Sequence, residues 1–387
     1  MNKLYIFTGM IVLSLLIICC SGEKESKDQT ETSLEASWPI FRGDRGLTGI
    51  AKGEMADDLE LLWSFKTEYD IKSSPVVGLG LVFIGSNDGF VYALDVDSGF
   101  VKWRLNMEEN VEAAPLLLDS TIYVGGLTGD FYALDALSGE LKWKFETDGQ
   151  IHGSANWCYA PDRKTKWILV GSYDNLMYCF DAKTGKLIWT FETEYYINGA
   201  PATDGKTVVF GGCDEVVYMV STADGTKAGE VDSGSYIAGS AALVGKRAYI
   251  GHYGEKVICI DTEAKKILWE YGVEEKGKAF FSSPAVNEDY VIIGSRDRSV
   301  HCIDRENGKS VWRFKTRDDV DSSPVICNDK VVVGSTDGRL YILNIDDGSE
   351  VWSYEIGASI TGCPAVTTGK IFIGAEDGIV YAFGETQ

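Results

Sequence analysis

The chain has 387 residues, and its 58 acidic against 36 basic side chains give a net charge of −22. A chain this acidic repels nucleic-acid phosphates unless it segregates a basic face, and the sequence shows no such face. Apolar residues make up 45% of the sequence, enough for a substantial core, which argues against disorder. The 43 glycines beside only 8 prolines favour many tight turns between β-strands.

The first twenty residues predict an export signal. Lys3 is followed by an apolar run that ends in Cys19 and Cys20, and at about 16 residues this run is short for a membrane span but typical of a signal peptide. A cysteine directly after such a run resembles the bacterial lipoprotein signal, which prefers a small residue before the lipidated cysteine. We therefore expect lipidation at Cys20, with an ordinary signal peptide or an uncleaved anchor as the alternatives.

Residues 21–37 are polar and charged and predict a flexible tether, so residues 38–387 remain as one folded domain. Within that domain one unit of about 40 residues recurs eight times. Its leading glycine appears as Gly85, Gly125, Gly171, Gly211, Gly251, Gly294, Gly334 and Gly374. Its closing tryptophan appears as Trp63, Trp103, Trp143, Trp189, Trp269, Trp312 and Trp352, with Gly229 in the remaining slot.

Each unit predicts four short antiparallel strands. In the first unit these lie near residues 71–77, 81–85, 90–94 and 100–105, with turns at Asn87-Asp88-Gly89 and Asp97-Ser98-Gly99. Four strands repeated eight times predict an all-β, eight-bladed β-propeller. The strand around Trp63 precedes the first complete unit, and the last unit lacks its fourth strand, so we expect the N-terminal strand to close the ring.

The stretch Ala93-x-Asp95-x-x-Ser98-Gly99-x-x-x-Trp103 and its copies resemble the tryptophan-docking repeat of quinoprotein-type eight-bladed propellers. The resemblance covers residues 38–387 and implies that each tryptophan packs between neighbouring blades. Residues 38–43, Trp-Pro-Ile-Phe-Arg-Gly, also resemble the lead-in of exported bacterial proteins with this repeat.

Two branches of that family carry different functions. One contains dehydrogenases with pyrroloquinoline quinone and calcium; the other contains BamB-like lipoproteins, which lack a cofactor and help assemble outer-membrane β-barrels. The single-propeller length and the lipoprotein-like leader favour the second branch, and the adjacent cysteines typical of the quinone enzymes occur only as Cys19-Cys20.

We therefore expect a monomeric, non-catalytic interaction scaffold without a cofactor, lipid-anchored on the periplasmic side of the outer membrane. Its partners would be envelope proteins, with a barrel-assembly machine as the most concrete candidate. Two alternatives stay open: a dehydrogenase that uses pyrroloquinoline quinone and calcium, and a ligand- or carbohydrate-binding sensor propeller.

One variable slot before the first strand of each unit offers a candidate site. We expect its occupants to gather at one mouth of the central channel and to bind a small ligand or a partner. They are Lys72, Glu112, His152, Asn198, Ala238, Phe281, Asp321 and Thr361. Solvated strand starts are the simpler interpretation, and Lys72 with Glu112 or Asp321 favours a structural ion pair over an acid–base pair.

Two insertions interrupt the repeat. The first contains Arg163, Lys164, Lys166 and Trp167, the only basic cluster with an aromatic side chain, and is a candidate partner loop. The second, residues 274–277, is expected on the opposite face. Most of the seven cysteines after the leader occupy small-residue slots, and the set predicts neither disulfides nor a metal site. His301 occupies a slot that is tyrosine in most units and predicts a packed aromatic substitute.

Overall fold

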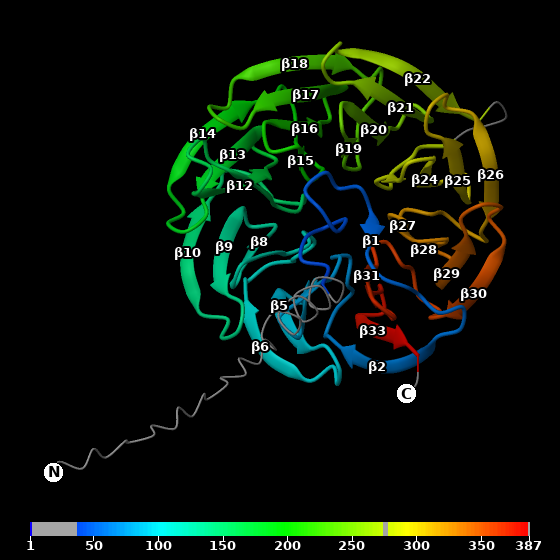
Figure 1. Cartoon of the computed structure of the whole chain (residues 1–387), viewed down its shortest axis with the longest axis horizontal. Helices are drawn as coiled ribbons and strands as arrows, with labels where there is room; N and C mark the ends of the chain where they lie inside the picture. The colour runs from blue at the N-terminus through cyan, green and yellow to red at the C-terminus, as the bar shows by residue number, and fades with distance from the viewer. Residues whose placement is uncertain (2–36, 274–277, 386–387) are drawn as a thin grey trace.

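The computed structural model describes Met1 and residues 37–273 and 278–385. Its strands form seven four-stranded sheets and one five-stranded sheet around a central axis, as Figure 1 shows. The predicted eight-bladed β-propeller is therefore confirmed. Within the described ranges, no helical segment has the length and apolarity that a membrane crossing requires.

The blades follow chain order and are numbered here 1 to 8, each given from its inner strand outward. Blade 1 contains β3 (Val76–Gly78), β4 (Leu81–Gly85), β5 (Phe90–Asp95) and β6 (Val101–Asn106). Blade 2 contains β7 (Leu116–Leu118), β8 (Thr121–Gly125), β9 (Asp130–Asp135) and β10 (Leu141–Glu146). Blade 3 contains β11 (Asn156–Tyr159), β12 (Lys166–Gly171), β13 (Leu176–Asp181) and β14 (Leu187–Glu192). Blade 4 contains β15 (Ala202–Thr203), β16 (Thr207–Gly211), β17 (Val216–Ser221) and β18 (Lys227–Asp232).

The second half of the ring continues the pattern. Blade 5 contains β19 (Ala242–Val244), β20 (Arg247–Gly251), β21 (Lys256–Asp261) and β22 (Lys266–Gly272). Blade 6 contains β23 (Ala285–Val286), β24 (Tyr290–Ser295), β25 (Ser299–Asp304) and β26 (Ser310–Lys315). Blade 7 contains β27 (Val325–Cys327), β28 (Lys330–Gly334), β29 (Arg339–Asn344) and β30 (Glu350–Glu355), with β1 (Ile50–Ala51) parallel to β27 on the inside. Blade 8 contains β31 (Ala365–Thr367), β32 (Lys370–Gly374), β33 (Ile379–Gly384) and β2 (Glu60–Lys66).

Blade 8 confirms the expected ring closure, because its outer strand comes from the N-terminal part of the chain. β2 pairs antiparallel with β33, with Trp63 opposite Ala382 and Phe65 opposite Val380. The last blade therefore contains both ends of the propeller, and no fourth strand is missing from it.

The inner strands are shorter than predicted. The expected first strand at residues 71–77 is wrong at its start, because β3 begins only at Val76. Most blades carry a proline directly before this strand, at Pro75, Pro115, Pro201, Pro284, Pro324 and Pro364. Proline has no N–H to donate to a ladder, so regular pairing starts after it. The variable slot consequently lies in the segment that leads into each inner strand.

The repeated tryptophans dock neighbouring blades, as the resemblance implied. Trp103 donates its indole N–H to the carbonyl oxygen of Ala136 in blade 2 at 2.9 Å. Its ring lies so close to Gly139 that a Cβ there would be 2.8 Å away. The indole bond recurs at Trp63, Trp143, Trp189, Trp269 and Trp312. Glycine is therefore required opposite each of these rings.

The seam between blades 4 and 5 lacks both members of this pair. Gly229 stands in the tryptophan slot, and Lys265 stands in the glycine slot with a positive φ of 54°. A Cβ at Gly229 would lie 2.8 Å from Cδ of Lys265, so the lysine stem occupies the space of the missing indole.

Residues 38–54 form a plug at one end of the central channel (the dark blue segment in Figure 1). The plug makes at least one hydrogen bond to every blade in ring order. The blade atoms that donate are the backbone N–H groups of Val77, Leu117, Thr203, Leu243, Val286, Ile326 and Gly369 and the side-chain amide of Asn156. Arg42 in the plug is fully buried and donates to the carbonyl oxygen of Pro324 at 2.5 Å.

A tyrosine–aspartate pair recurs inside the blades. Tyr341 donates its hydroxyl to Asp337 at 2.7 Å, and equivalent bonds join Tyr92, Tyr178, Tyr218 and Tyr381 to their own aspartates. In blade 6 the fully buried His301 takes the tyrosine position, with Nε2 3.0 Å from Asp297 and Nδ1 2.9 Å from the hydroxyl of Tyr271. The prediction that His301 is a packed aromatic substitute is confirmed.

His301 should make the protein sensitive to acid. Burial lowers the pKa of His301, and Asp297 opposes this only in part. Below the ordinary histidine pKa of about 6.5 the unfolded chain binds a proton that the folded protein does not, so stability falls as the pH falls. We expect His301→Tyr to reduce the drop in melting temperature between pH 7 and pH 5. Tyr341→His should increase that drop, and equal drops in all three proteins would contradict the assignment.

Candidate functional site

The variable slot lines one mouth of the channel, as predicted. A cavity of about 180 Å³ lies between this mouth and the plug. Seven of the eight slot residues line it: Lys72, Glu112, His152, Asn198, Ala238, Phe281 and Thr361. The eighth, Asp321, is held aside by Arg296. We call this end of the propeller the mouth face and the other end the plug face.

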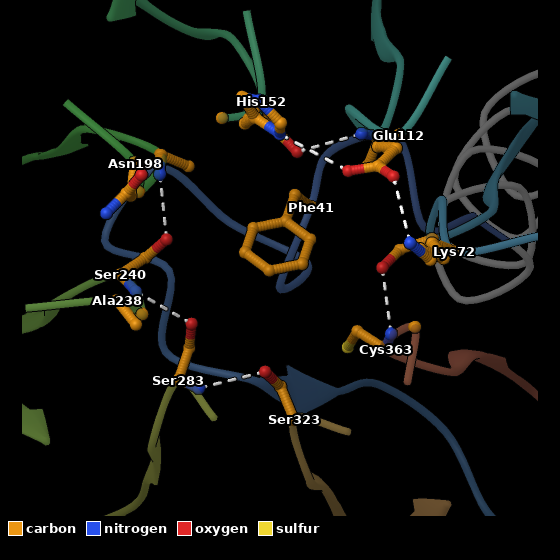
Figure 2. A pocket seen from close by; sticks show the side chains of 18 of the residues that line it. Phe41, Lys72, Glu112, His152, Asn198, Ala238, Ser240, Ser283, Ser323 and Cys363 are labelled. Carbon is orange, nitrogen blue, oxygen red and sulfur yellow. Dashed lines mark hydrogen bonds and ion pairs between the residues drawn. The ribbon is translucent and has the colours of Figure 1, made fainter. Parts of the chain in front are cut away.

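Lys72, Glu112 and His152 form one chain of contacts across three blades (Figure 2). Glu112 accepts from Nζ of Lys72 at 3.2 Å and lies 3.2 Å from Nδ1 of His152. The hydrogen bond from His152 and the charge of Lys72 hold the pKa of Glu112 below its usual range. Partial burial alone would lower the pKa of Lys72, but Glu112 outweighs burial and raises it. Each charge in this chain already has a partner, which is typical of a structural ion pair.

Phe41 of the plug forms the floor of the cavity and lies at the centre of Figure 2. Around it, backbone N–H groups donate to serine hydroxyls of the following blade. This pattern joins Ala114 to Ser154, Ala200 to Ser240, Ser240 to Ser283, Ser283 to Ser323, and Cys363 to Ser74. These backbone N–H groups in the cavity wall therefore already have hydrogen-bond partners within the protein.

Two further rings of residues surround the mouth, and neither ring was predicted from the sequence. In every blade the residue two positions before the variable slot accepts a backbone hydrogen bond from the turn between the second and third strands. The accepting residues are Asp70, Asn110, Gln150, Tyr196, Tyr236, Ala279, Asp319 and Ser359. The donating residues are Asn87, Leu127, Tyr173, Cys213, Tyr253, Arg296, Thr336 and Glu376. The repeat register that located the variable slot also locates these rings.

Blades 3 to 6 carry two groups of contacting aromatic side chains at the mouth, which together we call the aromatic strip. It consists of Tyr173, Tyr195, Tyr196, Tyr236, Tyr253 and Phe281. Tyr173 and Tyr196 stack nearly parallel with ring centroids 4.7 Å apart, and Tyr253 lies 4.4 Å from Phe281. Tyr195 and Tyr236 are 57% and 51% exposed. Exposed aromatic rings so close together are uncommon on a surface that binds nothing.

Acidic groups occupy the mouth beyond this strip. Arg296 stacks over Phe281 at 3.5 Å and donates to both carboxylate oxygens of Asp321. Burial and the neighbouring Asp321 and Asp318 raise the pKa of Asp319. The mouth face is thus divided into an aromatic half and a mainly acidic half.

The predicted partner loop is only partly exposed. Trp167 is 9% exposed and packs in the core of blade 3, so its assignment as a partner-binding aromatic residue is wrong. It lies inside β12, in the register that Leu81 occupies in blade 1. Lys166 pairs with Asp119 at 2.7 Å, whereas Arg163 and Lys164 lie in the exposed hairpin turn on the plug face.

The structure tests the predictions for the cysteines, but other predicted features lie outside the described residues. All seven described cysteines are unpaired thiols, and six are buried, as expected of small apolar fillers. In the same ranges no three His, Cys, Asp or Glu side chains are placed to hold a metal ion. Cys20, the tether and residues 274–277 lie outside the described residues.

The fold and the docked tryptophans define an eight-bladed propeller of the quinoprotein type. The family model described as "Outer membrane protein assembly factor BamB" matches residues 55–158, 160–228 and 213–387, so the chain belongs to this family. A comparison with curated proteins finds no significant match.

Solved structures of this fold include members with different functions. BamB from Moraxella catarrhalis has a TM-score of 0.70 at 19% identity, covering 85% of this chain and 98% of its own. Quinohemoprotein alcohol dehydrogenase from Comamonas testosteroni has a TM-score of 0.77 at 14% identity, covering 94% of this chain and 83% of its own. At these identities the likeness shows the fold alone.

Proposed function

We propose that this protein is a non-catalytic, exported scaffold of the bacterial cell envelope, anchored by lipid at Cys20 and serving the assembly of outer-membrane proteins. Membership of the BamB family supports a role in the assembly of outer-membrane proteins. The aromatic strip is the observation that carries the binding role, because tyrosines and an adjacent arginine are the residue types that dominate protein interfaces. The contacts of Glu112 with both Lys72 and His152 support a structural role for these side chains rather than proton transfer.

A crosslinking pull-down from envelope membranes tests this proposal. We expect the wild-type protein to recover a barrel-assembly protein, and Tyr195→Ala with Tyr196→Ala to lower that recovery about tenfold or more. Tyr69→Ala is the matched control, because Tyr69 is 63% exposed on the same face but lies in blade 1, outside the strip. Unchanged recovery by the double variant would contradict docking at the strip.

The donor set of the mouth does not fit a quinone dehydrogenase. A cavity of about 180 Å³ is smaller than the roughly 300–1,000 Å³ typical of organic ligand sites. Phe41 lies at the centre of the cavity, and the nearby carboxylates of Glu112 and Asp321 are already paired with cations of the protein. Reconstitution with pyrroloquinoline quinone and calcium should therefore produce no dye-linked alcohol oxidation.

Carbohydrate binding is the second candidate function. The stacked pair of Tyr173 and Tyr196 beside the amide of Asn198 favours it, because aromatic faces with adjacent polar groups suit sugar rings. Saturable binding to a glycan array, lost in Tyr195→Ala with Tyr196→Ala, would favour this function over protein docking.

A further inference from the structure

The plug face carries three large apolar side chains at the tips of turns in blades 1 and 2. We call Leu79, Phe100 and Leu137 the apolar tips; they are 51%, 75% and 61% exposed. On the mouth face, by contrast, the exposed large hydrophobic side chains of the described residues are tyrosines. The two faces therefore present different chemistry to their surroundings.

The repeat shows that folding does not require these residues. Blades 2, 5 and 7 have Asp119, Gly245 and Asn328 where blade 1 has Leu79. All four positions have a positive φ, which leucine adopts less readily than glycine, asparagine or aspartate. The Phe100 position holds Glu140, Lys186, Thr226, Lys266, Lys309 and Ser349 in the blades that follow. Leu79 thus opposes the backbone preference of its turn, and Phe100 is an apolar exception in a slot that is polar in the following blades.

The three tips lie on neighbouring turns. In blade 1 the N–H of Val96, in the turn that precedes Phe100, donates to the carbonyl oxygen of Gly80, which follows Leu79. Trp103, three residues after Phe100, donates its indole N–H to Ala136 beside Leu137 at 2.9 Å. These contacts join the turns of blades 1 and 2 at one side of the plug face.

Basic side chains adjoin the tips in blade 3. Arg163, Lys164, Lys183 and Lys186 are exposed in two turns of the plug face. Within the described ranges none of them forms an ion pair.

We propose that the plug face of blades 1 to 3 rests on an anionic lipid bilayer, with the apolar tips in the interface and the cations of blade 3 at the headgroups. The chain itself points to a membrane as the occupant. Trp38 pairs with Val77, two residues before Leu79, so the propeller domain begins next to one of the tips. Residues 21–37 separate Trp38 from the predicted lipid at Cys20, and a fully extended chain of that length spans at most about 60 Å.

A tether of this length keeps the propeller close to the bilayer, so a weak contact between the plug face and the lipid is enough for the plug face to rest on the membrane. The proposal rests on the predicted anchor of the proposed function. In the resulting orientation the mouth face, with its aromatic strip, points away from the membrane.

A fluorescence experiment on the lipidated full chain tests this orientation. The chain is reconstituted in vesicles of phosphatidylethanolamine and phosphatidylglycerol, in a Cys213→Ser background because the other described cysteines are buried. An environment-sensitive fluorophore is attached at Leu137→Cys or, as the control on the mouth face, at Tyr195→Cys. We expect blue-shifted emission and quenching by spin-labelled lipid at the Leu137 site only.

A second pair of variants tests the contribution of the tips. Leu79→Asn with Phe100→Asp should reduce quenching at the Leu137 site several-fold, whereas Tyr195→Ser with Tyr196→Ser should leave it unchanged. Water-like emission at the Leu137 site, equal quenching at both sites, or a chain that does not sediment with the vesicles would overturn the proposal. Partner recovery is measured separately, so a failure of membrane docking is distinguishable from a failure of the scaffold function.

Discussion

Replacement of Trp103 by alanine is expected to lower the free energy of unfolding by about 3–5 kcal/mol. The indole is 9% exposed, fills the seam between blades 1 and 2, and donates its N–H to Ala136. Its removal leaves a cavity against Gly139 and a carbonyl oxygen without its partner. Denaturant unfolding of the full chain measures the loss.

Trp352→Ala is the matched control for this prediction. Trp352 is half-buried and contacts Phe383 of blade 8, whose outer strand is β2, and no described glycine packs against its ring as Gly139 does against Trp103. We expect a smaller loss of stability from Trp352→Ala. Equal losses would show that ring burial alone, rather than docking on the glycine turn, determines the contribution of the repeated tryptophan.

Substitution of Gly49 by alanine is expected to destabilise the protein by about 2–4 kcal/mol. Gly49 has a φ of 68°, and a Cβ there would lie 2.1 Å from Nη2 of the buried Arg42. The methyl group would thus strain the backbone and displace a guanidinium that bonds blade 7. Thermal or denaturant unfolding should measure the combined loss of stability from backbone strain and from the displaced guanidinium.

Gly80→Ala separates the two costs. Gly80 has a φ of 75°, but no atom lies within 4 Å of the position that its Cβ would take. Only backbone strain should act there, with a loss of about 1 kcal/mol. A Gly49→Ala loss no larger than that of Gly80→Ala would contradict the tight packing of the plug around Arg42.

The repeat explains which parts of the structure could be predicted from the sequence. Blade number, ring closure and the location of the variable slot all follow from equivalent positions, since eight copies impose one register. The same alignment of the repeats would also have located the aromatic strip and shown that Trp167 is equivalent to the buried Leu81. Both results require a comparison of repeat positions other than the variable slot. The path of the plug could not be predicted, because residues 38–54 occur once and their partners are backbone N–H groups in seven blades and one side-chain amide in the eighth.

The inner strands show a different limit. The apolar pattern of residues 71–77 favours a strand, yet Pro75 removes the N–H that pairing needs, and β3 starts after it. The missing N–H of proline therefore determines where the inner strand begins, although the apolar pattern favours an earlier start. This is why Lys72 and its equivalents stand free of the ladder and can contact the next blade.

The pairing of β2 with β33 also determines when the ring is completed during synthesis of the chain. The plug and β2 are made before any blade, but their partners emerge one by one, and β33 ends only at Gly384. Until then β2 is an unpaired edge strand, which is a template for association with other chains. Loss of even the last strand by premature termination or C-terminal proteolysis would leave the ring open and β2 without a partner. The ring is thus closed only when β33 pairs with β2.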